Sequence, residues 1–283
     1  MKKSRKTAIV IGVILLIGIY YYVTLPAINI HSTDTWFYIA GLIVFILVFY
    51  VIRKRMRPTE IRESKPAKAM LTVLLAVGVV YLIGSILSSP IVNAKKYQKL
   101  LKVEKGNFTE DVEEVSFDSV PLLDKDTAEI LGDRKMGSMV DMVSQFEADD
   151  IYTQINYKER PVRVTPLKYA SFIKWITNQS EGIPAYIRID MASQNTELVK
   201  LDQGIKYSTS EYLNRNIYRH LRFRYPTAIF DELSFEIDDK GVPYWVAPVK
   251  KFNIGLFGGE TVGSVVLCNA VTGECKSYKI EDV

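Results

Sequence analysis

Residues 70–87 read MLTVLLAVGVVYLIGSIL, a run without a single charged side chain. A helix of about 20 mostly apolar residues crosses the hydrocarbon core of a bilayer. Backbone N–H and C=O groups in that core must pair with each other, so such a run forms a helix. Residues 7–25 and 36–52 are uncharged and apolar in the same way. The sequence therefore predicts three membrane-spanning helices within a membrane anchor at residues 1–90.

The first run has an alternative interpretation as a cleaved signal peptide, because basic residues precede it. Its apolar stretch is longer than the roughly 7–15 residues of a signal sequence, which favours a span. Basic residues also set the predicted orientation. One side of the membrane receives eleven of them: Lys2, Lys3, Arg5, Lys6, Arg53, Lys54, Arg55, Arg57, Arg62, Lys65 and Lys68. The other side has none in residues 26–35 and five lysines in residues 95–105. We predict a multi-pass protein of the cell membrane with a cytoplasmic N-terminus and an extracytoplasmic C-terminal region.

The rest of the 283-residue chain has the composition of a soluble α+β protein. Residues 91–150 form a predicted juxtamembrane α/β segment, with a basic amphipathic helix at 91–105, a strand at 112–117 and a helix at 124–136. Residues 151–204 form a first predicted unit. Alternating residues predict strands at 152–157 and 161–165 around the turn Lys158-Glu159-Arg160. Tyr169, Phe172, Ile173 and Ile176 have helical spacing, which predicts a helix over 166–177. Strands at 185–190 and 197–201 complete this unit.

Residues 205–283 form a second predicted unit of the same kind. Ser208 and Glu211 have the spacing of a capping box, which predicts a helix from there to about Arg222. Strands follow at 233–237, 243–249, 262–268 and 275–280. The fold class is thus a three-span α-helical membrane anchor followed by tandem units, each of one helix and antiparallel hairpins. Weak similarity between residues 187–200 and 266–277 favours duplication of one unit.

The last hairpin carries a resemblance to a known family. Its turn, Asn269-Ala-Val-Thr-Gly-Glu274, follows a helix and a strand and resembles the turn of PepSY domains. The wider frame of three spans and such units is similar to membrane proteins of Gram-positive bacteria. PepSY domains act as inhibitory or interaction modules in protease propeptides and envelope regulators. The resemblance, over residues 151–283, implies a binding or regulatory role. The chain departs from it in the two cysteines of the hairpin and in an additional hairpin around Tyr244-Trp245.

Signatures of catalysis and metal binding are largely absent from the sequence. It has no His-Glu-x-x-His, Gly-x-Ser-x-Gly or Cys-x-x-Cys. The glycine-rich residues 258–264 lack the lysine of a phosphate loop and precede a strand. Residues 238–241, Asp-Asp-Lys-Gly, are interpreted as a hairpin turn rather than a calcium loop. The two histidines, His31 and His220, have no pattern of metal ligands beside them. We predict no catalytic residue, no cofactor-binding residue and no metal ligand, and therefore a protein that is not an enzyme.

Two groups of residues are candidate sites. Arg215, Arg219 and Arg222 recur at helical spacing, and guanidinium groups suit the phosphate of lipid headgroups or wall polymers. The alternative is a solvated helix face in which Glu211 pairs with Arg215. Cys268 and Cys275 oppose each other if Asn269 faces Glu274, which permits a disulfide outside the cell. The alternative is two free thiols.

The preferred hypothesis is a membrane-anchored extracytoplasmic binding or regulatory protein. Its predicted partners are membrane lipid and an envelope protein or wall polymer, with no nucleic acid. Of Tyr244 and Trp245, neighbours on a strand, one should contact a partner and the other the core. The alternative hypothesis is an envelope enzyme or the sensing subunit of a transport complex.

Overall fold

The computed structural model describes residues 2–101, 103–116 and 120–280, with side chains from Ile11 onward. The chain divides into two compact units. The helical unit contains the N-terminal helices together with Tyr225–Ile229 and Lys250–Thr261. The sheet unit contains Val103–Arg224, Phe230–Val249 and Val262–Val283. Two strands, β7 (Pro243–Ile254) and β8 (Gly258–Asn269), therefore begin in one unit and end in the other.

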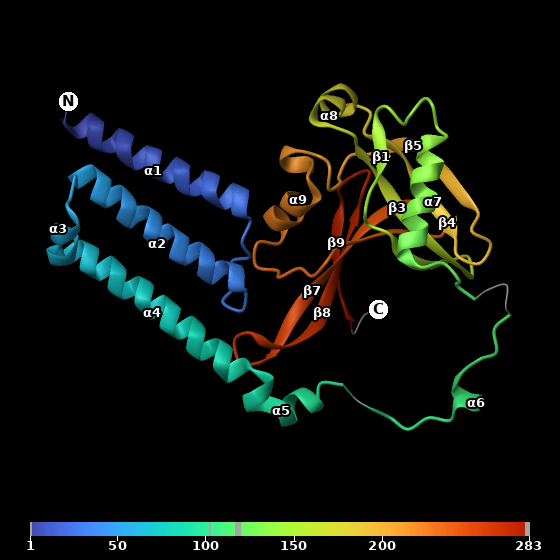
Figure 1. The fold of residues 1–283 in the computed structure, drawn as a ribbon, viewed down its shortest axis with the longest axis horizontal. Helices are drawn as coiled ribbons and strands as arrows, with labels where there is room; N and C mark the ends of the chain where they lie inside the picture. Colours follow the sequence, from blue (N-terminus) through green and yellow to red (C-terminus); the bar gives the residue numbers. More distant parts are fainter. Residues whose placement is uncertain (1, 102, 117–119, 281–283) are drawn as a thin grey trace. The chain divides into compact units, whose positions relative to one another are not determined.

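The helical unit is built on long apolar helices (Figure 1). Its helices are α1 (Lys2–Thr24), α2 (Thr33–Lys54), α3 (Pro58–Glu63), α4 (Lys65–Ser88) and α5 (Pro90–Gln98). By length and composition, α2 and α4 are long and apolar enough to cross a membrane. The described apolar part of α1, Ile11–Thr24, is shorter. Among the described residues, two helices therefore have membrane length, and the predicted third span stays a prediction.

Local chemistry explains where these helices end. Arg55 takes a left-handed conformation (φ 51°) after α2 and donates its backbone N–H to Ile52 and Val51 carbonyls. A proline at the first turn opens α3, α4 and α5, where its missing N–H costs nothing. The predicted basic helix at 91–105 corresponds to α5, which ends earlier, at Gln98.

The tip of the β7–β8 hairpin, Lys250–Thr261, packs onto the helices of its unit. Ser88 at the end of α4 is buried, and its Oγ accepts the backbone N–H groups of Leu256 (2.9 Å) and Phe257 (3.1 Å). The ring of Phe257 lies 5.1 Å from that of Tyr81, and Gly255 and Gly259 have positive φ. The turn of this tip is residues 255–257, and the glycine-rich residues 258–264, which were predicted to precede a strand, already belong to β8 (Gly258–Asn269).

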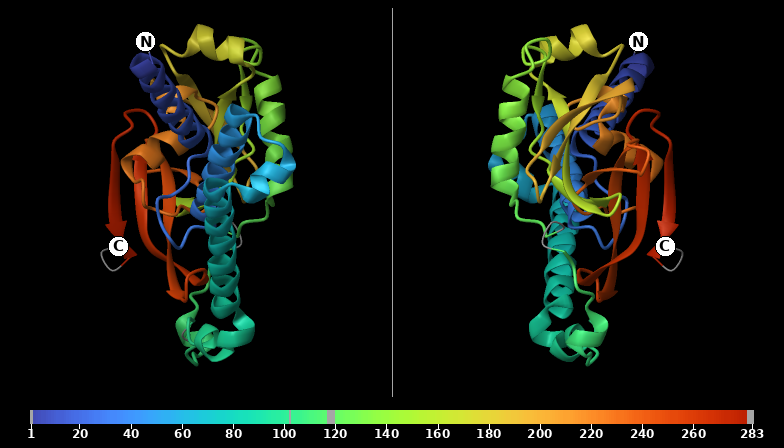
Figure 2. Two further views of the ribbon diagram at one scale, coloured as in Figure 1. Left: turned by 90° about the vertical axis from the view of Figure 1, so that its left-hand side faces the viewer. Right: turned by 90° about the vertical axis from the view of Figure 1, so that its right-hand side faces the viewer.

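The sheet unit contains two antiparallel sheets (Figures 1 and 2). The first, in the order β1-β3-β4-β5 with β2 also paired to β3, uses β1 (Phe146–Ala148), β2 (Thr153–Tyr157), β3 (Arg160–Tyr169), β4 (Ile183–Asp190) and β5 (Thr196–Ile205). The second, in the order β6-β7-β8-β9, uses β6 (Ser234–Ile237), β7 (Pro243–Ile254), β8 (Gly258–Asn269) and β9 (Cys275–Lys279). The core where the sheets meet contains the buried rings of Tyr186, Phe235 and Trp245.

Among the described residues, the α-helices of the sheet unit are α6 (Phe108–Asp111), α7 (Lys125–Gly137), α8 (Phe172–Asn178) and α9 (Ile217–Arg224). The predicted helix at 124–136 is confirmed by α7, whose first turn is capped by the Asp124 carboxylate. The predicted strand at 112–117 is not formed over residues 112–116, and residue 117 lies outside the described residues. Because β1 pairs with β3, the predicted boundary at residue 150 cuts through the first sheet.

The helix predicted over 166–177 is wrong in its first half. Strand β3 continues through Pro166, which pairs with Tyr186, as far as Tyr169. Helix α8 begins only after Ser171, whose hydroxyl accepts the backbone N–H of Lys174. The reason is burial: Leu167 and Tyr169 are buried as part of the sheet, and that packing outweighs the helical spacing of the segment.

The helix predicted from Ser208 to about Arg222 is also wrong in its first half, while residues 217–222 are helical as predicted. A 3-10 turn, Leu213–Arg215, comes first, and α9 begins at Ile217. Half of the capping box is present, because Ser208 Oγ accepts the backbone N–H of Glu211 at 3.2 Å. The Glu211 carboxylate accepts hydrogen bonds from the side chains of Tyr169 and Trp175, where a capping box would have it accept the backbone N–H of Ser208.

Candidate functional site

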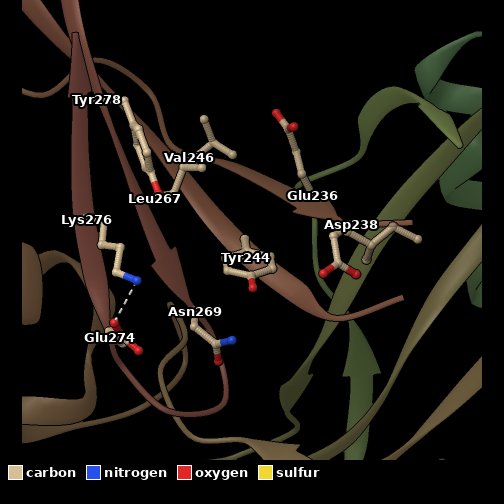
Figure 3. A pocket seen from close by; sticks show the side chains of 10 residues that line it. Glu236, Asp238, Tyr244, Val246, Leu267, Asn269, Glu274, Lys276 and Tyr278 are labelled. Carbon is tan, nitrogen blue, oxygen red and sulfur yellow. Dashed lines mark ion pairs between the residues drawn. The ribbon is translucent and has the colours of Figure 1, made fainter. Parts of the chain in front are cut away.

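A groove lies on the face of the second sheet that is turned away from its buried rings (Figure 3). Its volume is about 350 Å³. All four strands of the sheet and two of the three turns that join them contribute lining residues: Glu236, Ile237, Asp238, Tyr244, Val246, Leu267, Asn269, Glu274, Lys276 and Tyr278. Tyr244 and Val246 form part of the floor, while the carboxylates lie at its two sides.

Alternation along the strands explains why these side chains share one face. Successive residues of a strand point to opposite faces, so buried Trp245 leaves its neighbour Tyr244 on the groove side. Trp245 Nε1 donates to the Tyr207 carbonyl at 2.8 Å on the inner side. The expectation that one of the pair is a core residue and the other is available to a partner agrees with this arrangement.

Pairing of the strands places the lining residues next to one another. Glu236 is paired with Tyr244 across β6 and β7, and Leu267 with Lys276 across β8 and β9. Strand β9 ends the sheet among the described residues, and most of its side chains are exposed. The groove therefore extends to a sheet edge, which is where an extended peptide can add as a further strand.

Two turn residues give the groove fixed ends. The Asp238 carboxylate accepts the backbone N–H groups of Lys240 (2.9 Å) and Val242 (2.8 Å). Asn269 Oδ1 accepts those of Val271 and Thr272, both at 2.9 Å. These bonds identify both segments as Asx-type turns, which is the predicted role of residues 238–241.

The groove is electronegative. Its three carboxylates, from Glu236, Asp238 and Glu274, face one ammonium group, and its formal charge is −2. That ammonium, Lys276 Nζ, lies 3.1 Å from Glu274 Oε1. The hydrogen bond to Glu274 raises the pKa of Lys276, and both side chains are about two-thirds exposed (66% and 65%). Because Lys276 pairs with Glu274, the opposite wall of the groove, which carries Glu236 and Asp238, keeps its negative charge.

Behind the groove, β8 and β9 are joined by a disulfide between Cys268 and Cys275, which oppose each other directly. His220 of α9 lies beside it, and Nε2 donates to the Gly273 carbonyl at 2.8 Å. Burial lowers the pKa of His220, which keeps the ring neutral in this bond. His220 and the two sulfurs lie within 4.8 Å of one another. Cysteine binds a metal as a thiolate, and the sulfurs of Cys268 and Cys275 are bonded to each other instead. We therefore interpret the disulfide and the His220 hydrogen bond as contacts that stabilise the hairpin.

The three arginines do not form the predicted stripe. Arg215 precedes α9 and donates to the Gln179 carbonyl at 2.6 Å. The Arg222 guanidinium lies over the Phe230 ring, 5.6 Å from its centroid. Arg219 lines a second cavity of about 320 Å³. The stripe fails because it required one continuous helix from Ser208, and the structure has a 3-10 turn and a shorter helix there.

This second cavity contains a residue whose role the sequence misassigned. Glu211 is buried, and its carboxylate accepts hydrogen bonds from Tyr169 Oη (2.8 Å) and Trp175 Nε1 (2.7 Å). Burial raises the pKa of Glu211 despite these bonds, and burial together with the carboxylate raises that of Tyr169. Its spacing from Ser208 indicated a cap, and nothing else in the sequence indicates a buried carboxylate.

No protein-family model, curated protein or solved structure matches the chain. The resemblance of residues 269–274 to a PepSY turn accordingly stays a prediction. We identify the groove on the second sheet as the candidate site from the geometry of this chain alone.

Proposed function

We propose that the chain is a membrane-anchored, extracytoplasmic binding protein whose groove on β6–β9 holds an extended, positively charged segment of another envelope protein. The observation that carries the proposal is the groove itself, which has an aromatic and aliphatic floor, a formal charge of −2 and an open sheet edge at one side. The three-span topology with a cytoplasmic N-terminus belongs to the proposal. The membrane-length helices α2 and α4 and the distribution of basic residues support it.

An extended peptide suits the groove for two reasons. Along β9 a peptide backbone finds N–H and C=O groups of an edge strand, which supply sequence-independent hydrogen bonds. The part of the peptide that leaves this edge and crosses the sheet face can place apolar side chains on the floor at Tyr244, Val246 and Leu267. Basic side chains farther along it then lie beside Glu236 and Asp238, on the β6 side of the groove. Electrostatic complementarity of this kind speeds association and selects among partners.

The proposal is tested with the full chain in lipid nanodiscs and a labelled ten-residue peptide that alternates lysine with valine, followed by fluorescence anisotropy. We expect the lysine peptide to bind and a glutamate–valine peptide not to. Tyr244→Ala removes part of the floor and should weaken binding by roughly 10-fold, the scale of an interface hot spot. Glu236→Lys should weaken it by a similar factor at low salt and by less at high salt.

Tyr218→Ala is the matched control, since Tyr218 is half-exposed on α9 and does not line the groove. Equal affinity for the lysine and glutamate peptides would contradict the proposed charge selection. Equal loss of binding in the Tyr244 and Tyr218 variants would show that the peptide binds elsewhere.

A further inference from the structure

An exposed apolar patch lies on the sheet unit away from the groove residues. It is formed by Phe172, Ile173 and Ile176 of α8 and by Tyr212 and Leu213, and these five side chains are 41–69% exposed. The Phe172 and Tyr212 rings touch, with centroids 5.1 Å apart. Phe172, Ile173 and Ile176 are the apolar positions whose spacing predicted this helix, and in the structure they face outward. A contiguous group of large apolar side chains on a surface usually marks an interaction site.

The patch stands on a rigid base. Trp175 is buried beneath it, with its ring 4.7 Å from Tyr212 and its Nε1 bonded to Glu211. Leu213 takes a left-handed conformation (φ 53°), which is costly for a residue with a branched side chain and is rarely kept without a reason. The backbone there holds Leu213 63% exposed. The structure thus presents the apolar side chains to the outside, in a fixed arrangement.

Basic and hydroxyl groups border the patch. Lys174 lies within α8, and Arg215 is held by its bond to the Gln179 carbonyl. Next to Phe172 and Tyr212 lies the cavity of about 320 Å³, which Arg219 lines together with the hydroxyls of Ser171, Thr209 and Ser210. Glu211 also lines it, but both of its oxygens accept hydrogen bonds from the protein. The cavity therefore places hydroxyl groups and a guanidinium beside an apolar surface, with the Thr209 hydroxyl donating to Asp149 at 2.7 Å.

We propose that the apolar patch and this cavity bind the surface of an anionic lipid bilayer, with the apolar side chains among the acyl chains and a headgroup phosphate at Arg219. Apolar and aromatic side chains bordered by cations are the pattern of interfacial membrane contact. The charges favour lipid over a protein partner, because anionic leaflets attract such cations. A tether to the same membrane raises the effective concentration, so a weak contact suffices. The inference rests on the proposed membrane anchoring but not on the groove.

The test uses the full chain in nanodiscs of neutral lipid or of lipid with an anionic fraction. A polarity-sensitive fluorophore is attached at Ile173→Cys, and its quenching by spin-labelled lipid is measured. The chain's own cysteines are bonded to each other and do not react. Val140→Cys, on an 83% exposed residue after α7, is the control for a surface away from lipid. Phe45→Cys, within α2, reports the anchoring.

We expect quenching at positions 45 and 173 but not at 140, with quenching at 173 stronger in anionic nanodiscs. Arg219→Gln should lower the ratio of docked to undocked protein about fivefold, the effect of one charge at an anionic surface. Arg222→Gln, which alters a guanidinium stacked on Phe230, should leave that ratio unchanged.

Three results would overturn the proposal. Quenching at 45 without quenching at 173 would refute the contact while leaving the anchoring intact. Absence of quenching at 45 would refute the anchoring on which it rests. A fluorophore at 173 that is shielded from water without lipid quenching would show that protein covers the patch.

Discussion

Removing a single atom, Ser88 Oγ, should break the hydrogen bonds that join helix α4 to the β7–β8 tip. Ser88 Oγ is a single acceptor for two backbone donors, Leu256 N and Phe257 N, and it donates in turn to the Gly84 carbonyl at 2.6 Å. Ser88→Ala removes that oxygen without adding volume. The tip is further fixed by Tyr97, whose hydroxyl donates to the Ser88 carbonyl and accepts the backbone N–H of Gly259.

The magnitude follows from the two donors. A buried N–H that loses its acceptor costs about 1–3 kcal/mol. Ser88 is 2% exposed, so water reaches its site poorly, although some relaxation of the tip will recover part of the cost. We therefore expect Ser88→Ala to lower the free energy of opening the tip by about 2–4 kcal/mol. Because 1.4 kcal/mol is a factor of ten, amide protection should fall by roughly 30- to 1,000-fold.

Hydrogen exchange of the full chain, followed by mass spectrometry of peptides covering residues 250–261, measures this directly. The Gly259 amide is the informative position, because its own acceptor, Tyr97, is not altered. If the tip opens as one body, Gly259 loses protection together with Leu256 and Phe257. Ser85→Ala is the matched control, since Ser85 Oγ donates only within α4, to the Tyr81 carbonyl. Equal protection of the tip in the Ser88 and Ser85 variants would refute the assignment of Ser88 as the joint.

Two further predictions concern buried polar groups of the sheet unit. Burial raises the pKa of Glu211 above its ordinary value of 4.5, so the folded state holds a proton more tightly than the unfolded chain. The free energy of unfolding should then fall as the pH rises from about 4.5 through the folded pKa of Glu211. Thermal midpoints followed by tryptophan fluorescence at several pH values measure this dependence, and Glu211→Gln should abolish it. Parallel pH profiles for the two proteins would contradict this. Tyr152 Oη is buried and has no hydrogen-bond partner among the described residues. Tyr152→Phe should therefore raise the free energy of unfolding by roughly 1 kcal/mol, seen as a higher thermal midpoint. A lower midpoint would show that the hydroxyl is bonded.

The strands were the most predictable part of the fold. At residues 153–169 the alternation of β2 and β3 is interrupted by a two-residue turn in which Lys158 and Glu159 both have positive φ. A two-residue turn with positive φ at both positions matches the twist of a hairpin. The turn therefore explains both the break in the alternation and the pairing of β2 with β3. The same logic located β4, β5, β8 and β9, because a period of two is visible in sequence wherever one face is buried and the other is not.

Helix prediction failed where one local pattern has two outcomes. The residues Tyr169, Phe172, Ile173 and Ile176 have helical spacing, but Tyr169 belongs to β3 and the other three lie on an exposed face. Spacing says that residues share a face, not which way the face points. Glu211 is a similar case, because Ser208 and Glu211 meet as a capping box predicts while the carboxylate is drawn away by two donors distant in sequence.

The groove marks the boundary of what the sequence can predict about a site. Alternation alone separates Tyr244 from Trp245, and turn chemistry alone locates Asp238 and Asn269. Nothing local places Glu236 beside Tyr244 or Lys276 beside Leu267, since those neighbours come from pairing between strands. The negative charge of the groove is likewise a property of the assembled sheet, in a chain whose overall charge is +4. The proposal of a cationic partner therefore rests only on the folded arrangement, because a net charge of +4 by itself favours anionic partners.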